Sequence, residues 1–237
     1  MSLPKIGYPT LELELPSNGK KIKYRPYIVK EEKVLLLALE SEEEGPIKEA
    51  IKELISNCVT SRIKVEELPS FDLEYIFLKI RAASAGEMIT MKVTCRDDNE
   101  TEVETSINIE EVEVIKPEGH TNKIMLTDTL GIIMKYPSMD RFIESEFLNK
   151  DIKTEEVFKF IADHIEQVFD DEEVWDMSTT SKKEMEEWVE TLTNKQFEAI
   201  QNFYETMPKL RHEFKVKNPN TGVESSYVIE GLQNFFV

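Results

Sequence analysis

A helical segment with almost no polar side, followed directly by a β-hairpin, constrains the fold of this chain most strongly. The sequence Leu68-Pro69-Ser70-Phe71-Asp72 is typical of a helix start, and the apolar pattern that follows runs to Arg81. Gly86 ends the helix, because glycine tolerates the left-handed conformation at a helix C-terminus. Residues 88–95 and 103–109 then alternate with a period of two, which predicts a hairpin. Because a helix without a polar side must be buried, we expect residues 68–116 to form the core for the rest of the chain.

The segments before this core predict a small hairpin and two helices. Residues 9–15 and 20–26 alternate as strands do, and Asn18-Gly19 between them is a strong hairpin signal. Residues 29–39 and 46–58 carry their apolar side chains at helical spacing. The N-terminal half is therefore expected to mix strands with helices.

Helical spacing prevails from Thr154 onward. One apolar stripe spans residues 157–169 and ends at the acidic residues 170–173, with Trp175 in the loop that follows. Residues 127–135, which precede this region, fit either a strand or a short helix.

The last part of the chain predicts two more helices and a second hairpin. Capping boxes begin the helices, and they pair Ser181 with Glu184 and Thr193 with Gln196. The strands that close the chain flank a turn rich in asparagine, at residues 218–222.

These patterns together predict an α+β protein. Residues 1–116 would form a mixed strand and helix half with a β-hairpin, and residues 117–153 a connecting segment. Residues 154–237 would form a helical half closed by the second hairpin, which would resemble a zinc ribbon without its metal. The two halves could also form one integrated domain.

Composition places the chain among folded proteins of a reducing compartment. Its 237 residues are enough for a sizeable core. Two cysteines, Cys58 and Cys95, cannot make a disulfide framework, which fits a cytoplasm. No apolar run approaches the roughly 20 residues that cross a bilayer. The first residues lack the apolar region of a signal peptide.

The charge is strongly acidic and unevenly distributed. The net charge of −18 argues against affinity for a phosphate backbone and favours solubility or a basic protein partner. Residues 151–190 carry 14 acidic and 4 basic side chains, whereas residues 1–35 carry 7 basic and 4 acidic ones. Two interpretations stay open, namely solvated helix faces and complementary docking within the protein or between chains.

Catalytic motifs are missing from the sequence. There is no phosphate-binding loop, no G-x-S-x-G and no H-E-x-x-H. His120, His164 and His212 lie far apart, without acidic or cysteine neighbours at ligand spacing, and His164 fits an ordinary packed histidine. We therefore expect neither an enzyme nor a bound cofactor.

The two hairpin turns raise the question of a metal site. A zinc ribbon needs a Cys-x-x-Cys pair in each of two turns. The first turn here is Cys95-Arg96-Asp97-Asp98, and the second is Asn218-Pro219-Asn220-Thr221-Gly222. Because Asp98, Asn218 and Thr221 stand where ligating cysteines would be needed, the sequence predicts that neither turn holds zinc.

Five stretches in this order resemble one protein family. They are the opening Leu3-Pro4-Lys5-Ile6, the strand Lys21-Ile22-Lys23-Tyr24-Arg25-Pro26, the helix start Val29-Lys30-Glu31-Glu32-Lys33, the stretch Phe71-Asp72-Leu73-Glu74-Tyr75, and the ending Gly231-Leu232-Gln233-Asn234-Phe235-Phe236. Together they resemble the baseplate hub family of T-even-like contractile-tailed phages, over nearly the whole chain. Some relatives carry cysteine pairs in the two turns, and this chain departs from them there.

The resemblance implies a structural or assembly role in the phage tail baseplate, without catalytic residues. Its partners would be other baseplate or hub proteins, with neither nucleic acid nor a membrane span involved. It implies assembly in the host cytoplasm, and a place in the virion tail if the protein stays there. Two alternatives stay open: a hub component that remains in the virion, and a transient assembly chaperone that leaves.

Two groups of residues are candidate partner contacts. The first is the acidic run Asp170, Asp171, Glu172 and Glu173, which could steer a basic partner. The second is the C-terminal tail, with Leu232, Phe235 and Phe236. These apolar side chains would either pack on helices of the same chain, near Trp188 or Phe203, or enter a pocket on a neighbouring subunit.

Overall fold

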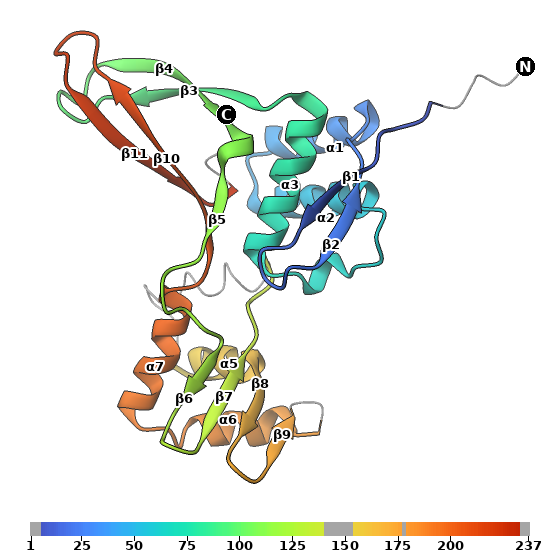
Figure 1. Ribbon diagram of the computed structural model, residues 1–237, viewed down its shortest axis with the longest axis vertical. Helices are drawn as coiled ribbons and strands as arrows, with labels where there is room; N and C mark the ends of the chain where they lie inside the picture. The colour runs from blue at the N-terminus through green and yellow to red at the C-terminus, as the bar shows by residue number, and fades with distance from the viewer. Residues whose placement is uncertain (1–5, 140–153, 177–178, 233–237) are drawn as a thin grey trace, which may run out of the picture. The chain divides into compact units, whose positions relative to one another are not determined.

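The computed structural model describes residues 6–139, 154–176 and 179–232, and these form two units (Figure 1). The first unit comprises Met1–Ile115 with Lys209–Val237, and the second comprises Lys116–Pro208. Both units contain helices and antiparallel strands, so the prediction of a mixed α+β protein is confirmed. No helix in the described ranges is both long and apolar enough to cross a bilayer.

The first unit is built around the helix α3, Ser70–Ala85. Its preceding elements are β1 (Leu11–Glu14), β2 (Lys21–Tyr24), α1 (Val29–Glu40), α2 (Glu44–Cys58) and a short 3-10 turn at Val65–Glu67. The predicted burial of α3 is confirmed, since Ile76 and Ile80 are fully buried. Even Asp72, in its first turn, is buried, and its carboxylate accepts a hydrogen bond from the Ser17 backbone N–H at 2.9 Å. Hydrogen bonding of this kind offsets the cost of burying a charged group.

Two long hairpins complete the first unit. The first, β3 (Met88–Thr94) with β4 (Glu102–Asn108), follows α3, and a 3-10 turn at Ile109–Glu111 leads on to β5 (Glu113–Ile115). The second, β10 (Lys209–Lys217) with β11 (Glu224–Glu230), comes from the end of the chain. Lys209 in β10 pairs with Ile115 in β5, giving the strand order β11-β10-β5.

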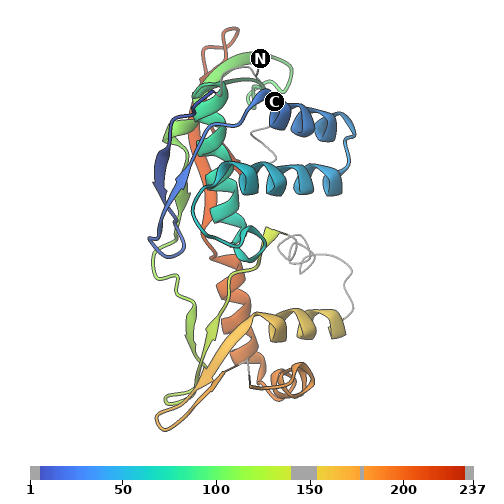
Figure 2. The same cartoon turned by 90° about the vertical axis from the view of Figure 1, so that its right-hand side faces the viewer.

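The second unit is a four-stranded antiparallel sheet with helices on one face (Figure 2). Its strands run in the order β6 (Lys123–Met125), β7 (Gly131–Met134), β8 (Ile165–Phe169) and β9 (Val174–Asp176). The helices are α5 (Thr154–His164), α6 (Lys182–Val189) and α7 (Asn194–Glu205). Side chains of all three helices join one face of the sheet in a single core, which includes Ile132, Ile161, Met185 and Phe203.

The expectation of one helical stripe over residues 157–169 was wrong in its second half. The helix ends at His164, and Ile165–Phe169 is the strand β8, which pairs with β7 and β9. The spacing of Ile165 and Val168 fits the buried side of a helix as well as that of a strand. Spacing alone therefore could not distinguish a helix from a strand here. Trp175, expected in a loop, lies in the edge strand β9. The region predicted as a helical half is therefore partly sheet.

The terminal hairpin also lies in a different unit from the helices that precede it. From the sequence we expected this hairpin to close the helical half, residues 154–237. In the structure, Lys209–Val237 belongs to the first unit. The physical reason is strand pairing, because β10 forms its sheet with β5, which lies about 100 residues earlier in the chain.

Candidate functional site

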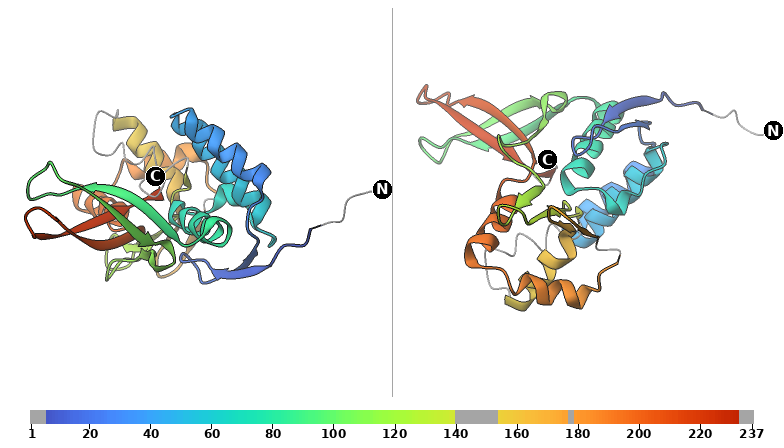
Figure 3. Two further views of the ribbon diagram at one scale, coloured as in Figure 1. Left: turned by 90° about the horizontal axis from the view of Figure 1, so that it is seen from above. Right: turned by 60° about the horizontal axis from the view of Figure 1, so that its bottom comes forward.

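The turns of the two long hairpins lie against each other in the first unit (Figure 3). Each turn closes on a residue with positive φ, Asn99 at 56° and Gly222 at 77°. The Asn99 N–H donates to the Cys95 carbonyl, and the Gly222 N–H donates to the Asn218 carbonyl, each at 2.9 Å. The two turns therefore have the same backbone form. Except for Cys95, the first and fourth residues of both turns carry polar side chains.

Hydrogen bonds between side chains join these turns. Asn218 is 1% exposed, and its Nδ2 donates to Asp98 Oδ2 at 2.8 Å and to both Asp97 oxygens at 3.1 Å. The Thr221 hydroxyl also donates to Asp97. Asn220 Nδ2 donates to the Thr101 hydroxyl at 3.0 Å. We call Asp97, Asp98, Thr101, Asn218 and Thr221 the turn cluster.

The side chain of Tyr227 makes further contacts between the two hairpins, next to the turn cluster. The Tyr227 hydroxyl accepts from the Arg96 backbone N–H and donates to the Thr94 carbonyl, each at 3.0 Å. The Arg96 guanidinium lies over the Tyr227 ring, 4.8 Å from its centroid. Such a cation–π contact adds to the attraction between the two hairpins.

The two carboxylates of the turn cluster are stabilised in their ionised form. Hydrogen bonds from Thr221 and Asn218 lower the pKa of Asp97. Hydrogen bonds from the Thr101 side chain and backbone lower the pKa of Asp98 still further. Hydrogen bonds to a carboxylate favour its charged form. Both carboxylates are therefore ionised at neutral pH, and they accept hydrogen bonds from uncharged donors.

The structure brings together the four positions at which a zinc ribbon would place its ligands. They hold Cys95, Asp98, Asn218 and Thr221 instead of four thiolates, and hydrogen bonds link Asn218 to both Asp98 and Thr221. Among the described residues there is no group of three or more His, Cys, Asp or Glu side chains suited to a metal ion. The absence of zinc stays a prediction, which metal analysis can test.

The acidic candidates lie in the hairpin turn between β8 and β9, and not on a helix face. The Asp170 carboxylate accepts from the backbone N–H groups of Glu172 and Glu173, each at 2.8 Å. These bonds lower the pKa of Asp170. Asp171, Glu172 and Glu173 are exposed. The Asp170 carboxylate therefore shapes the turn, while the other three are available at the surface.

The C-terminal candidates are only partly described. Leu232 is 3% exposed and belongs to the first unit, whereas Trp188 and Phe203, the neighbours expected from the sequence, belong to the second. Phe235 and Phe236 lie outside the described residues, so their role as partner contacts stays a prediction.

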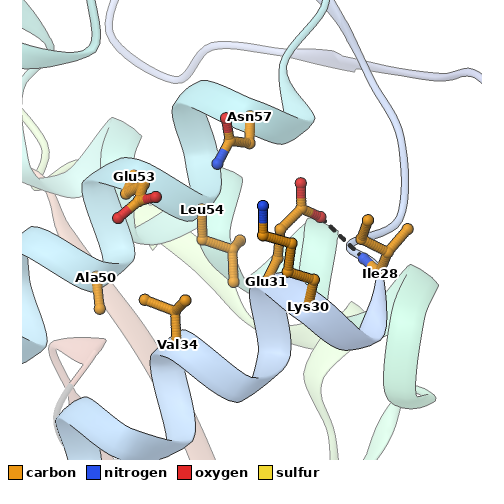
Figure 4. Close-up of a pocket in the computed structure, with 8 residues that line it drawn as sticks. All are labelled: Ile28, Lys30, Glu31, Val34, Ala50, Glu53, Leu54 and Asn57. Carbon is orange, nitrogen blue, oxygen red and sulfur yellow. Dashed lines mark hydrogen bonds between the residues drawn. The ribbon is translucent and has the colours of Figure 1, made fainter.

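A groove of about 180 Å³ runs between α1 and α2 (Figure 4). Val34, Ala50 and Leu54 supply apolar groups to it. Glu31 at its edge is already paired, because Arg25 donates to both of its oxygens at 2.6 and 2.9 Å. That pairing lowers the pKa of Glu31, so its carboxylate is held as an ion and is poorly suited to act as a base.

The helix α1 carries exposed apolar side chains. Val29, Leu36 and Leu37 are 80%, 52% and 55% exposed, respectively. Single exposed apolar residues are common, but several on one helix mark a surface that another protein can cover. The sequence shows an apolar run here but does not reveal which of its members face outward.

Two of the three histidines, His120 and His164, are buried. In the second unit, His120 Nδ1 lies 2.9 Å from the Thr206 hydroxyl, and its Nε2 lies 2.9 Å from the Tyr136 hydroxyl. Burial lowers the pKa of His120. His164 is 6% exposed and its Nδ1 lies 2.7 Å from the Phe160 carbonyl, so the expectation of a packed histidine is confirmed.

Comparison with known protein families finds a match. The family is described as "T4 bacteriophage base plate protein", and its model matches residues 8–237. Comparison with curated proteins and with solved structures finds no match. The matched range takes in both hairpin turns, the α1–α2 groove and the acidic turn. Because the match covers nearly the whole chain, this chain belongs to the family of T4 bacteriophage base plate proteins.

Proposed function

We propose that this protein is a structural or assembly subunit of the phage baseplate hub and acts by binding other baseplate proteins. Membership of the baseplate family over residues 8–237 is the observation that carries this proposal. The exposed apolar side chains of α1 and the exposed acidic turn at residues 170–173 support it, since both are surfaces suited to a protein partner.

The proposal places the protein in the host cytoplasm while baseplates assemble, and then in the tail of the virion. It assigns no enzymatic step, because the groove carboxylate Glu31 is paired and the buried histidines are engaged in packing. It assigns no nucleic-acid partner, because a net charge of −18 repels phosphate.

A second candidate is a transient chaperone for hub assembly, absent from the mature virion. The acidic surface suits this role equally, since charge steers both lasting and passing encounters. The two roles differ in whether the protein remains in the virion after assembly.

Quantitative mass spectrometry of purified virions separates the two candidates. Virions are compared with tail intermediates isolated from cells infected by the phage that encodes this chain. A constant copy number in both samples supports the hub subunit. Presence in intermediates but loss from virions supports the chaperone, and absence from both contradicts the proposal.

A further inference from the structure

The outer face of the sheet in the second unit carries an apolar row. The strand register places Met125, Gly131, Phe169 and Val174 side by side across all four strands. The next row, which contains the fully buried Ile132, faces the helices. Because side chains alternate between the faces of a sheet, the first row faces away from them. Met125 is 48% exposed and Val174 is 61% exposed.

Gly131 lets the aromatic ring in this row lie flat on the sheet. A Cβ atom at Gly131 would overlap Phe169 Cζ, so no residue with a side chain fits there without displacing the ring. The Lys123 ammonium lies 4.6 Å from the centroid of the same ring and helps to hold it. An aromatic side chain that is already fixed loses little conformational freedom on binding, which is typical of interface anchors.

Acidic groups lie along one side of the row, at one end of the sheet. The β6–β7 turn contains Asp128, and the β8–β9 turn contains Asp171, Glu172 and Glu173, all of them exposed. Both turns follow directly on the row Met125–Gly131–Phe169–Val174, so they lie at the same end of the sheet (Figure 1). The whole unit is acidic, since residues 116–208 carry 21 acidic and 10 basic side chains.

We propose that Met125, Phe169 and Val174, with these four acidic residues, form a docking site for a basic baseplate protein. The inference rests on the function proposed above and names its contact surface. An apolar side chain of the partner lies on the row, while lysine or arginine side chains next to it face the carboxylates. Charge complementarity selects this occupant. A second copy of the same acidic unit would meet like charge, and a nucleic acid would be repelled.

Charge reversal in the phage tests the proposal. A phage lacking the gene is complemented with the variant D171K/E172K/E173K, or with V174D. The matched control is E190K/E198K/E205K, which makes the same charge change at three exposed residues on the helical side of this unit. Circular dichroism and thermal melting of each purified chain establish that it folds. We expect the first two variants to lower the plaque titre roughly tenfold or more, because like charges and unpaired charges at an interface oppose binding, and the control to complement fully.

Suppressor mutations then identify the occupant. Plaques that arise on the charge-reversed variant should carry Lys or Arg replaced by Asp or Glu in one other baseplate protein. Suppressors confined to basic residues of this same chain would indicate a second copy and overturn the proposal. Full complementation by both site variants would overturn it as well. If loss of the gene itself leaves the titre unchanged, the proposed function fails instead, so the two failures are distinguishable.

Discussion

Asn218 Nδ2 lies 2.8 Å from Asp98 Oδ2, so one buried amide joins two hairpin turns that are 120 residues apart in the chain. The two hairpins come from different ends of the first unit, and the turn cluster holds their tips together. Hydrogen bonds thus hold the tips at the positions where the ligands of a zinc ribbon would lie.

Removing the amide should loosen the two tips. We expect N218A to lower the free energy of unfolding by about 1–3 kcal/mol, because a buried polar contact is lost. Urea unfolding measures this change. The control is N220A, which removes one hydrogen bond from an exposed residue of the same turn and should cost less than about 0.5 kcal/mol. A loss below about 0.5 kcal/mol in N218A would show that Asn218 does not stabilise the joined hairpins.

The turn cluster should weaken in acid. The folded pKa values of Asp97 and Asp98 lie below their ordinary values, so their stabilising effect is complete above the unfolded pKa of about 3.9 and is lost as the pH falls below it. We therefore expect these two groups to leave the stability nearly constant between about pH 5 and pH 7 and to lower it in stronger acid. The D97N variant, followed by urea unfolding over the same pH range, should show a smaller fall. An unchanged acid profile in D97N would contradict the assignment.

The chain should contain no stoichiometric zinc when purified without added metal. Three of the four ligand positions hold Asp98, Asn218 and Thr221 instead of cysteines, and these side chains are hydrogen-bonded to each other or to Asp97. Elemental analysis provides the measurement, and one zinc per chain would refute the expectation. The variant D98C/N218C/T221C, with the native Cys95, is the matched positive control and should take up zinc one to one.

Truncation in the central helix should be costly. Leu78 in α3 is 1% exposed, and its replacement by alanine leaves a cavity. We expect L78A to lower the free energy of unfolding by about 2–5 kcal/mol in urea. A loss below about 1 kcal/mol would mean that neighbouring side chains move in to fill the cavity, or that α3 is not the core of this unit.

Features that depend on residues close together in the chain could be predicted from the sequence. The burial of α3 followed from the lack of a polar side, and the capping boxes at Ser181 and Thr193 predicted the starts of α6 and α7. The strand β8 was missed, because Ile165 and Val168 fit a helix by spacing and become a strand only through pairing with β7.

The candidate surfaces depend on contacts between distant segments, which spacing does not reveal. The sequence placed Asp98 and Asn218 in two turns but could not show that the turns meet. The apolar row was also missed, although Gly131 at the start of a strand was a usable signal for a close approach, here by Phe169.

Electron microscopy of lysates from a phage without this gene shows whether the protein is needed to build baseplates. We expect heads without complete baseplates, and recovery of baseplates when the gene is supplied from a plasmid. Complete baseplates in the absence of the gene would contradict a role for this protein in building them.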